Sequence, residues 1–336
     1  MRMWKHFSGP ERLMLTGLPV LLGSLALSVF LPGGAVSSGA LWAALWGRET
    51  EQAAQLILFQ VRLPRALGAV YCGAGLSISG LLLQSALNNP LASPGIIGVN
   101  AGAGLFALLA GLLFPLQTLA RSGAAFLGAL AAVGLIQAIV RRAGASRSTV
   151  ILSGVAVSSL LTALSQAIIT FYPEAIADRV AFTLGGLHGL DWNQLLFALP
   201  FLGAGLLLAV LLSGGVDLFP LGDEAAEGLG LHVSLWRLLT VLCAAILAGA
   251  AVSLCGLLSF VGLMVPNLIR LGHAHSCRQQ IGLCCLWGGS FLLLCDCLAR
   301  TLFFPYELPV GLLLSCLGAP FFVWMLIRRR KEAGHA

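Results

Sequence analysis

The chain consists mainly of apolar runs of about 20 residues, the length that a helix needs to cross a bilayer, and these runs follow one another almost end to end. Of the 336 residues, 58% are hydrophobic and only 10% are charged. No segment between the runs is long enough to form a separate soluble domain. We therefore expect an all-α, polytopic membrane protein with a single transmembrane domain over residues 1–336.

Ten membrane-spanning helices are predicted from these runs, and the eighth of them is short. They cover residues 13–31, 62–86, 96–114, 118–140, 149–172, 192–212, 235–256, 259–271, 279–302 and 308–327. The first run is longer than the apolar core of a signal peptide, about 7 to 15 residues, so we interpret it as a span. Two longer connections remain, an external loop at about 32–61 and a cytoplasmic loop at about 213–234.

The basic residues predict the orientation of the chain. If both termini are cytoplasmic, every strong basic cluster but one faces the cytoplasm, as the positive-inside bias requires. These clusters are Arg2, Lys5 and Arg12; Arg141, Arg142 and Arg147; Arg270 and Arg278; and the tail from Arg328 to Lys331. The exception is Arg62 with Arg65 at the outer end of the second span. Their side chains either reach lipid headgroups or bind an acidic partner. The net charge of +6 is explained by topology, so no nucleic-acid partner is expected.

A polar connection with two prolines, NNPLASPG at residues 88–95, joins the second and third spans. Irregular backbone near a bilayer is tolerated where it lines a cavity or packs on protein. A span that only anchors a protein has no need for such an elbow, so this segment favours a transporter. Small residues on both sides of it, Gly73, Gly80 and Gly102 among them, allow helices to approach closely.

A weak internal repeat aligns Gly73 with Gly249 and, at the same offset, Pro90 with Pro266. The two copies are separated by an odd number of predicted spans, so they run through the bilayer in opposite senses, as in transporters with inverted repeats. Chance matches between glycine- and leucine-rich helices are the alternative explanation.

The source of energy follows partly by exclusion. A phosphate-binding loop needs a Gly-Lys-Ser/Thr sequence, and the two lysines, Lys5 and Lys331, have no such context. Asp296 is the only acid deep inside a predicted span, and Arg300 follows one helical turn later. We favour an intrahelical ion pair over a proton relay for Asp296. An ion-coupled secondary transporter remains the alternative from a different class.

The cytoplasmic loop is acidic where its neighbours are basic, with Asp223, Glu224 and Glu227 close together. It is either a solvated helix or an element that couples the chain to a separate ATPase, and spacing alone does not decide between them. Eight of the nine cysteines lie in apolar runs and are expected to act as small hydrophobic side chains. His273, His275 and Cys277 have ligand chemistry, but a solvated basic loop is the preferred interpretation.

Four stretches together resemble the FecCD family, the permease subunits of bacterial ABC importers for iron-siderophores, haem and cobalamin. They are RLPRALGAVYCGAGLSISGLLLQSALNNPLASPGIIGV, LGDEAAEGLG, GLLSFVGLMVPNLIRL and DCLARTLFFPYELPVGLLLSCLGAPFFVWML, and they span most of residues 62–326. The resemblance implies the type II ABC importer fold in the bacterial cytoplasmic membrane. It also implies import of an iron chelate such as a ferric siderophore, with haem or cobalamin as alternatives.

The partners are likewise implied by the resemblance. They are two ATP-binding subunits, an extracytoplasmic substrate-binding protein, membrane lipid, and a second permease copy or a paralogue. No cofactor is expected on this chain, and ATP is expected to be used by the partner subunit, so the chain itself is not expected to be an enzyme.

Three groups of site residues are carried over from the family by position. Arg62, Arg65 and Arg300 are expected to dock the binding protein. The coupling segment comprises Leu221, Gly222, Asp223, Glu224, Ala225, Leu229 and Gly230. The cytoplasmic gate and elbow comprise Asn89, Pro90, Leu91, Ser146 and Ser148. The chain departs from the family pattern at Asp223, where Glu is commoner, at Arg147 between the two gate serines, and at Asn267, which replaces a His.

Overall fold

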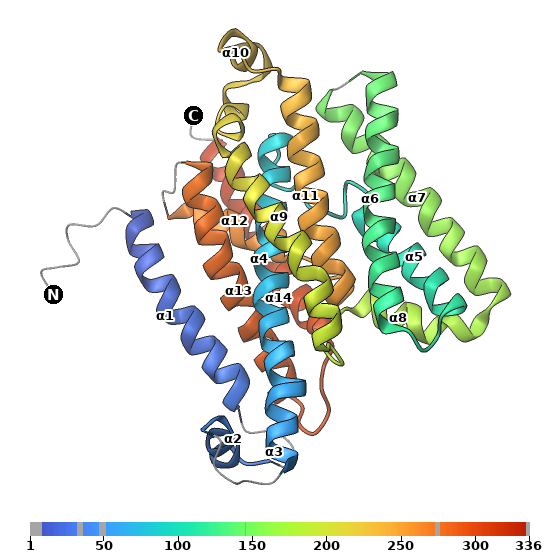
Figure 1. Ribbon diagram of the computed structural model, residues 1–336. Coiled ribbons are helices and arrows are strands. Elements are labelled where there is room, and N and C mark those ends of the chain that lie inside the picture. The colour runs from blue at the N-terminus through green and yellow to red at the C-terminus, as the bar shows by residue number, and fades with distance from the viewer. Residues whose placement is uncertain (1–8, 32–35, 47–51, 145, 273–275, 334–336) are drawn as a thin grey trace, which may run out of the picture.

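The computed structural model describes residues 9–31, 36–46, 52–144, 146–272 and 276–333. All regular secondary structure in these ranges is helical, which confirms the predicted all-α class (Figure 1). Each predicted span corresponds to one helix. These helices are α1 (Gly9–Phe30), α4 (Leu63–Ala86), α5 (Val99–Leu113), α6 (Thr118–Ala143), α7 (Arg147–Phe171), α9 (Trp192–Val216), α11 (Val233–Cys255), α12 (Val261–Leu271), α13 (Cys277–Thr301) and α14 (Val310–Ala333). By length and composition, 7 helical segments can cross a membrane, and α5, α12 and the apolar part of α14 are shorter.

Shorter helices occupy the connections and mark the two ends of the molecule. The segment predicted as an external loop contains α2 (Ser38–Leu45), α3 (Gln52–Leu56) and a π-helical stretch, η2 (Ile57–Arg62). The predicted cytoplasmic loop contains the 3-10 turn η4 (Phe219–Leu221) and α10 (Asp223–Gly228). These two sets lie at opposite ends of the bundle, which we call the α2 end and the α10 end (Figure 1). A further helix, α8 (Ile176–Leu184), follows the turn η3 (Pro173–Ala175) and was not predicted.

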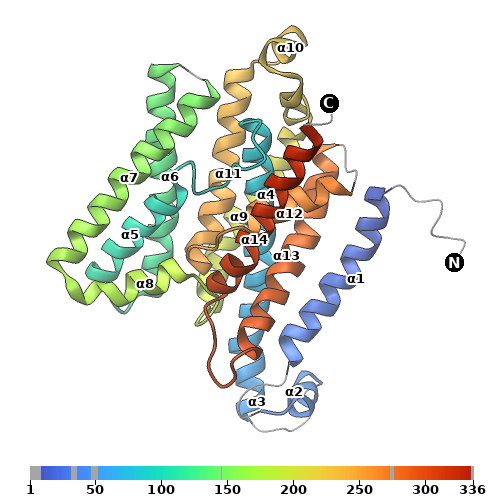
Figure 2. The same cartoon turned by 180° about the vertical axis from the view of Figure 1, so that it is seen from behind.

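Helix α4 lies at the centre of the bundle and packs against α9, α11, α12 and α13. Most of its residues are buried on all sides, as expected for a helix that is apolar around its whole circumference. Helix α1 lies at one side against α13, whereas α5, α6, α7 and α8 form a second group at the other side (Figures 1 and 2). The elbow that follows α4 connects these two parts.

Glycines allow the central helices to approach one another closely, as predicted from the small residues. A Cβ atom at Gly80 would collide with the carbonyl oxygen of Gly262 on α12. A Cβ atom at Gly73 would similarly collide with the carbonyl oxygen of Gly288 on α13. Backbone-to-backbone contacts of this kind supply the packing that holds helices together where lipid removes the hydrophobic driving force.

We expect Gly80→Ala to lower the free energy of unfolding by about 1–3 kcal/mol, the usual cost of overpacking a well-packed interior. Gly134→Ala is the matched control, because α6 has open space around Gly134 and alanine favours a helix more than glycine does. Thermal unfolding of the two purified variants in one detergent measures the difference. Equal midpoints for the two variants would contradict this account of the α4–α12 contact.

The two copies of the internal repeat run in opposite directions, as predicted. Helix α4 begins at the α2 end and finishes near the α10 end, whereas α11 begins beside α10 and runs back (Figure 1), and the two helices pack together. The aligned prolines differ locally, because Pro90 lies in the non-helical elbow and Pro266 lies inside α12.

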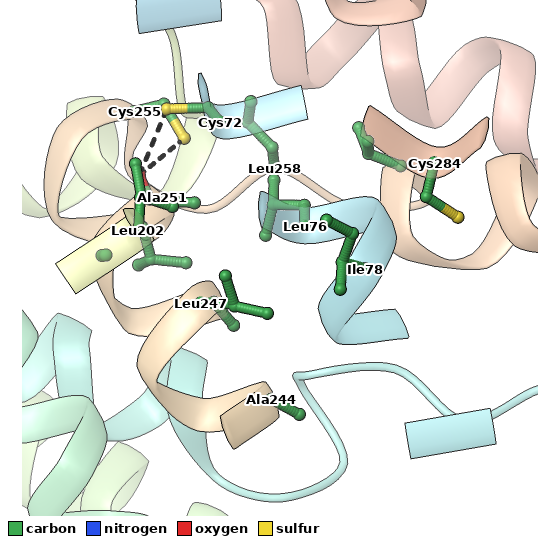
Figure 3. Close-up of a cluster of buried hydrophobic side chains, with 14 of the residues drawn as sticks. Cys72, Leu76, Ile78, Leu202, Ala244, Leu247, Ala251, Cys255, Leu258 and Cys284 are labelled. Carbon is green, nitrogen blue, oxygen red and sulfur yellow. Dashed lines mark hydrogen bonds between the residues drawn. The ribbon is translucent and has the colours of Figure 1, made fainter. Parts of the chain in front are cut away.

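The cysteines pack as small side chains, and all nine are free. Figure 3 shows Cys72 of α4 and Cys255 of α11, whose thiols donate to the carbonyl oxygen of Ala251 at 3.6 and 3.0 Å. Within the described ranges no group of three His, Cys, Asp or Glu side chains could hold a metal ion. His273 and His275 lie outside those ranges.

Candidate functional site

The three arginines predicted to dock a binding protein meet at the α2 end around one buried carboxylate. Arg65 of α4 donates from Nη2 to Asp296 Oδ1 at 2.9 Å and from Nη1 to Glu307 Oε2 at 2.8 Å. Arg300 Nε lies 3.2 Å from Asp296 Oδ2, which confirms the predicted ion pair one turn along α13. The side chain of Asp296 is fully buried, so two guanidinium groups compensate one carboxylate that has no access to solvent.

Arg62 and Arg300 also hold the end of α1. Arg62 Nη1 donates to the carbonyl oxygens of Val29 and Leu31 at 2.8 and 2.7 Å. Arg300 Nη2 donates to the carbonyl oxygen of Ser28 at 3.1 Å. The cluster therefore ties together the ends of α1, α4 and α13 and the loop that leads to α14.

These guanidinium groups face the interior of the subunit. Arg62 and Arg65 are 8% and 7% exposed, whereas the side chain of Glu307 is 42% exposed. Burial alone would raise the pKa of Glu307, but the hydrogen bond and the charge of Arg65 outweigh it and hold that pKa below its ordinary value. Docking by Arg62, Arg65 and Arg300 stays a prediction, and a charge reversal at either buried arginine would also break a structural contact.

At the α10 end, the side chain of Asp223 connects α10 with α7 and α11, which are distant from one another or from α10 in the chain. Its carboxylate accepts from Arg147 Nη2 at the start of α7 at 2.6 Å. It also accepts from Arg237 Nη2 of α11 at 2.8 Å to each oxygen. Burial opposes ionisation, but the hydrogen bonds and charges of Arg237 and Arg147 are stronger and lower the pKa of Asp223. Asp223 is therefore ionised in this contact. The contact also provides an ion-pair partner for Arg147, which stands between the predicted gate residues Ser146 and Ser148.

The same contact extends to the elbow. Arg237 is 4% exposed, and its Nε donates to the carbonyl oxygen of Ala86, the last residue of α4, at 3.2 Å. One guanidinium thus contacts both the coupling segment and the backbone just before the elbow. Arg237 was not identified from the sequence, although a single arginine in an otherwise apolar span is itself a signal.

Asn267 and Asn89 fix the elbow itself. The side-chain amide of Asn267 donates to the carbonyl oxygen of Pro90 at 3.0 Å. The side-chain oxygen of Asn89 accepts from the backbone N–H of Leu91 at 2.9 Å. Asn267, which replaces a His of the family pattern, therefore positions the elbow from α12. Among the predicted gate residues, Ser146 caps α7 by accepting from the N–H of Thr149 at 3.1 Å, and Ser148 is exposed.

The remaining coupling residues form an exposed tip that carries two leucines and a carboxylate. Leu221 and Leu229 are 57% and 64% exposed, and Glu224 is exposed between them. Gly222 and Gly230 have φ angles of 95° and 86°, which non-glycine residues rarely adopt. The two glycines let the chain turn into and out of α10, which lies at one extreme of the molecule (Figure 1).

Comparison with known proteins agrees with this arrangement. The model of the FecCD transport family matches residues 20–328. The chain belongs to the FecCD transport family. Among its FecCD relatives, the Fe(3+)-citrate import system permease protein YfmD of Bacillus subtilis (strain 168) is 38% identical over 82% of this chain and 83% of the relative. The hemin transport system permease protein HmuU of Yersinia pestis is 36% identical over 96% of this chain and 97% of the relative.

Other FecCD relatives have a different cargo in their names. The vitamin B12 import system permease protein BtuC of Yersinia enterocolitica is 36% identical over 94% of this chain and 92% of the relative. A solved structure described as an inward-facing conformation of a metal-chelate type ABC transporter has a TM-score of 0.83 and 26% identity, and covers 95% of this chain and 99% of that one. The FecCD assignment makes this chain a multi-pass membrane permease of the ABC importer type, a subunit class without an ATPase site of its own.

Proposed function

We propose that this chain is the permease subunit that moves an iron chelate into the cytoplasm, driven by ATP hydrolysis in a separate subunit bound at its α10 end. The observation that carries the proposal is the Asp223 contact. It connects an exposed tip with two leucines, suited to a partner protein, with the start of α7 and the end of α4 through two arginines.

The proposed mechanism uses only contacts of this chain. A partner that displaces α10 carries Asp223 with it, and Asp223 is bound to Arg147 and Arg237. Because Arg237 also holds the carbonyl oxygen of Ala86, the displacement reaches the elbow and the gate serines together. Breaking or shifting ion pairs at such a junction is a common way to convert a local movement into a change between two packings.

Orientation and partners follow from the same proposal. The α10 end carries the basic residues Arg141, Arg142, Arg147, Arg270 and Arg278, which favours the cytoplasmic side for this end and for both termini. The α2 end then faces outward, towards a substrate-binding protein. A second permease copy is proposed to complete the pathway. The leucines and valines on one side of α7, such as Leu152, Val155 and Leu160, are 69%, 56% and 55% exposed and are available for it.

An iron chelate is the cargo that the relatives favour. The names of YfmD and HmuU specify Fe(3+)-citrate and hemin, both of which contain iron. The names of HmuU and BtuC specify hemin and vitamin B12, so haem and cobalamin remain the alternatives to a ferric siderophore or citrate for the same machinery.

Affinity purification of the tagged permease from its native membrane in a mild detergent tests the proposal. We expect an ATP-binding subunit among the copurified proteins identified by mass spectrometry. Leu229→Asp should lose that subunit, because it places a charge on the exposed tip. Leu116→Asp changes a leucine that is 95% exposed between α5 and α6 and should retain it. Purification without any ATPase, from wild type and both variants, would contradict the proposal and favour a secondary transporter.

A further inference from the structure

A cavity of about 360 Å³ lies near the α2 end between α5, α6, α8, the start of α9 and the end of α11. Its size is within the usual range for small-molecule sites, about 300–1,000 Å³. His188, whose side chain is 87% exposed, lies at its edge, so the cavity is open to the surface. None of the predicted site residues lines it.

Arg179 of α8 contributes a guanidinium group to the lining of this cavity. Its Nη1 atom is buried and has no hydrogen-bond partner among the described residues. The guanidinium lies against Gly104 of α5, where a Cβ atom would come within 2.5 Å of Nη1. Burial lowers the pKa of Arg179 from its ordinary value, but arginine remains charged in proteins. A buried guanidinium nitrogen without an acceptor costs free energy unless a ligand supplies one.

The other charged groups of the cavity leave an excess of positive charge. Arg121 Nη1 pairs with Asp178 Oδ1 at 3.1 Å, so this arginine and this carboxylate compensate each other. Arg121 Nε is buried and also lacks a hydrogen-bond partner. His188 Nδ1 lies 3.7 Å from Glu307 Oε2, outside the cavity. The buried side-chain donors without a partner among the lining residues are therefore cationic nitrogens, and Asp178 is the one carboxylate among the described residues that line the cavity.

We propose that this cavity binds a carboxylate group of the transported chelate, with Arg179 as the principal ligand and Arg121 beside it. A planar guanidinium donates two parallel N–H hydrogen bonds to the oxygens of a carboxylate. The inference rests on the proposed function and narrows it. Ferric citrate and haem carry free carboxylates, whereas the side arms of vitamin B12 are amides, so the site favours the first two over the third.

The test uses the complete importer in proteoliposomes, with ferric citrate, hemin and cyanocobalamin as probes. Uptake of a carboxylate-bearing probe should fall at least about tenfold in Arg179→Gln, because removing one partner of a desolvated charge pair has an effect of this order or larger. Arg179→Lys should retain a larger share of uptake. Arg142→Gln, which removes the same charge from an exposed position at the other end of α6, should match wild type.

Further measurements separate the possible failures. Copurification of the ATPase with Arg179→Gln should be unchanged, which shows that the variant folds and assembles. If wild type takes up ferric citrate or hemin and Arg179→Gln takes up the same probe equally well, the inference is overturned while the proposed function stands. Loss of a bound anionic lipid from Arg179→Gln in native mass spectrometry, with normal uptake, would assign the cavity to lipid phosphate and also overturn it. Absence of ATP-dependent uptake of every probe by wild type would instead contradict the proposed function.

Discussion

Asp296→Asn is expected to destabilise the protein by about 3–5 kcal/mol, the usual cost of removing one partner from a buried ion pair. The variant removes the carboxylate that pairs with Arg300 and leaves Arg65 with Glu307, which is partly exposed, as its remaining carboxylate partner. Thermal unfolding in detergent measures the loss. Asp178→Asn is the matched control, because its pair with Arg121 is 50% and 31% exposed and such pairs contribute about 0–1 kcal/mol.

This prediction also changes how the alternative of an ion-coupled carrier can be tested. Loss of transport in Asp296→Asn would follow from misfolding alone, so it does not identify a proton relay. If Asp296→Asn unfolds at the wild-type temperature and yet fails in transport, the structural role assigned to Asp296 is wrong and a relay becomes the better explanation. The same reasoning applies to charge reversals of Arg62 and Arg65, whose effect on docking is interpretable only beside a stability measurement.

Asp223→Arg is expected to reduce coupled transport at least about tenfold, because bringing like charges together costs several kcal/mol. The new side chain would face Arg147 and Arg237, which now share the Asp223 carboxylate. The measurements are ATP turnover stimulated by the binding protein and cargo uptake by the reconstituted complex. We expect basal ATP turnover to persist while stimulation and uptake are lost.

Glu227→Arg is the control for this substitution. It introduces the same change in charge on the same helix, at an exposed position. Equal losses in Asp223→Arg and Glu227→Arg would mean that the charge of α10 matters only for attachment of a partner. That outcome would contradict the proposal that the ion pairs of Asp223 transmit a displacement of α10 to the elbow.

The sequence predicted the spans well because apolar length is a local property. Each of the ten predicted runs corresponds to a helix, and most boundaries agree within a few residues. Helix α8 was missed because its 9 residues are too few for a span and Asp178 with Arg179 interrupt its apolar pattern. The recurrence of its apolar residues at helical spacing was the available signal.

The site was only partly predictable, because its contacts join charges that are distant in the chain. Arg300 lies one turn from Asp296, and that pair was predicted. Arg65 reaches the same carboxylate across 231 positions, and Arg147 reaches Asp223 across 76. Such pairs depend on how helices are arranged, which periodicity does not specify. Family resemblance identified Asp223 and the gate serines separately, and only the fold shows that Arg147 and Arg237 connect them.

The most direct test of the account is uptake of a ferric chelate into proteoliposomes that contain the permease, its copurified ATPase and the binding protein. We expect uptake that requires ATP and persists when proton and sodium gradients are abolished. Uptake that continues without the ATPase and stops when the gradients are removed would contradict it.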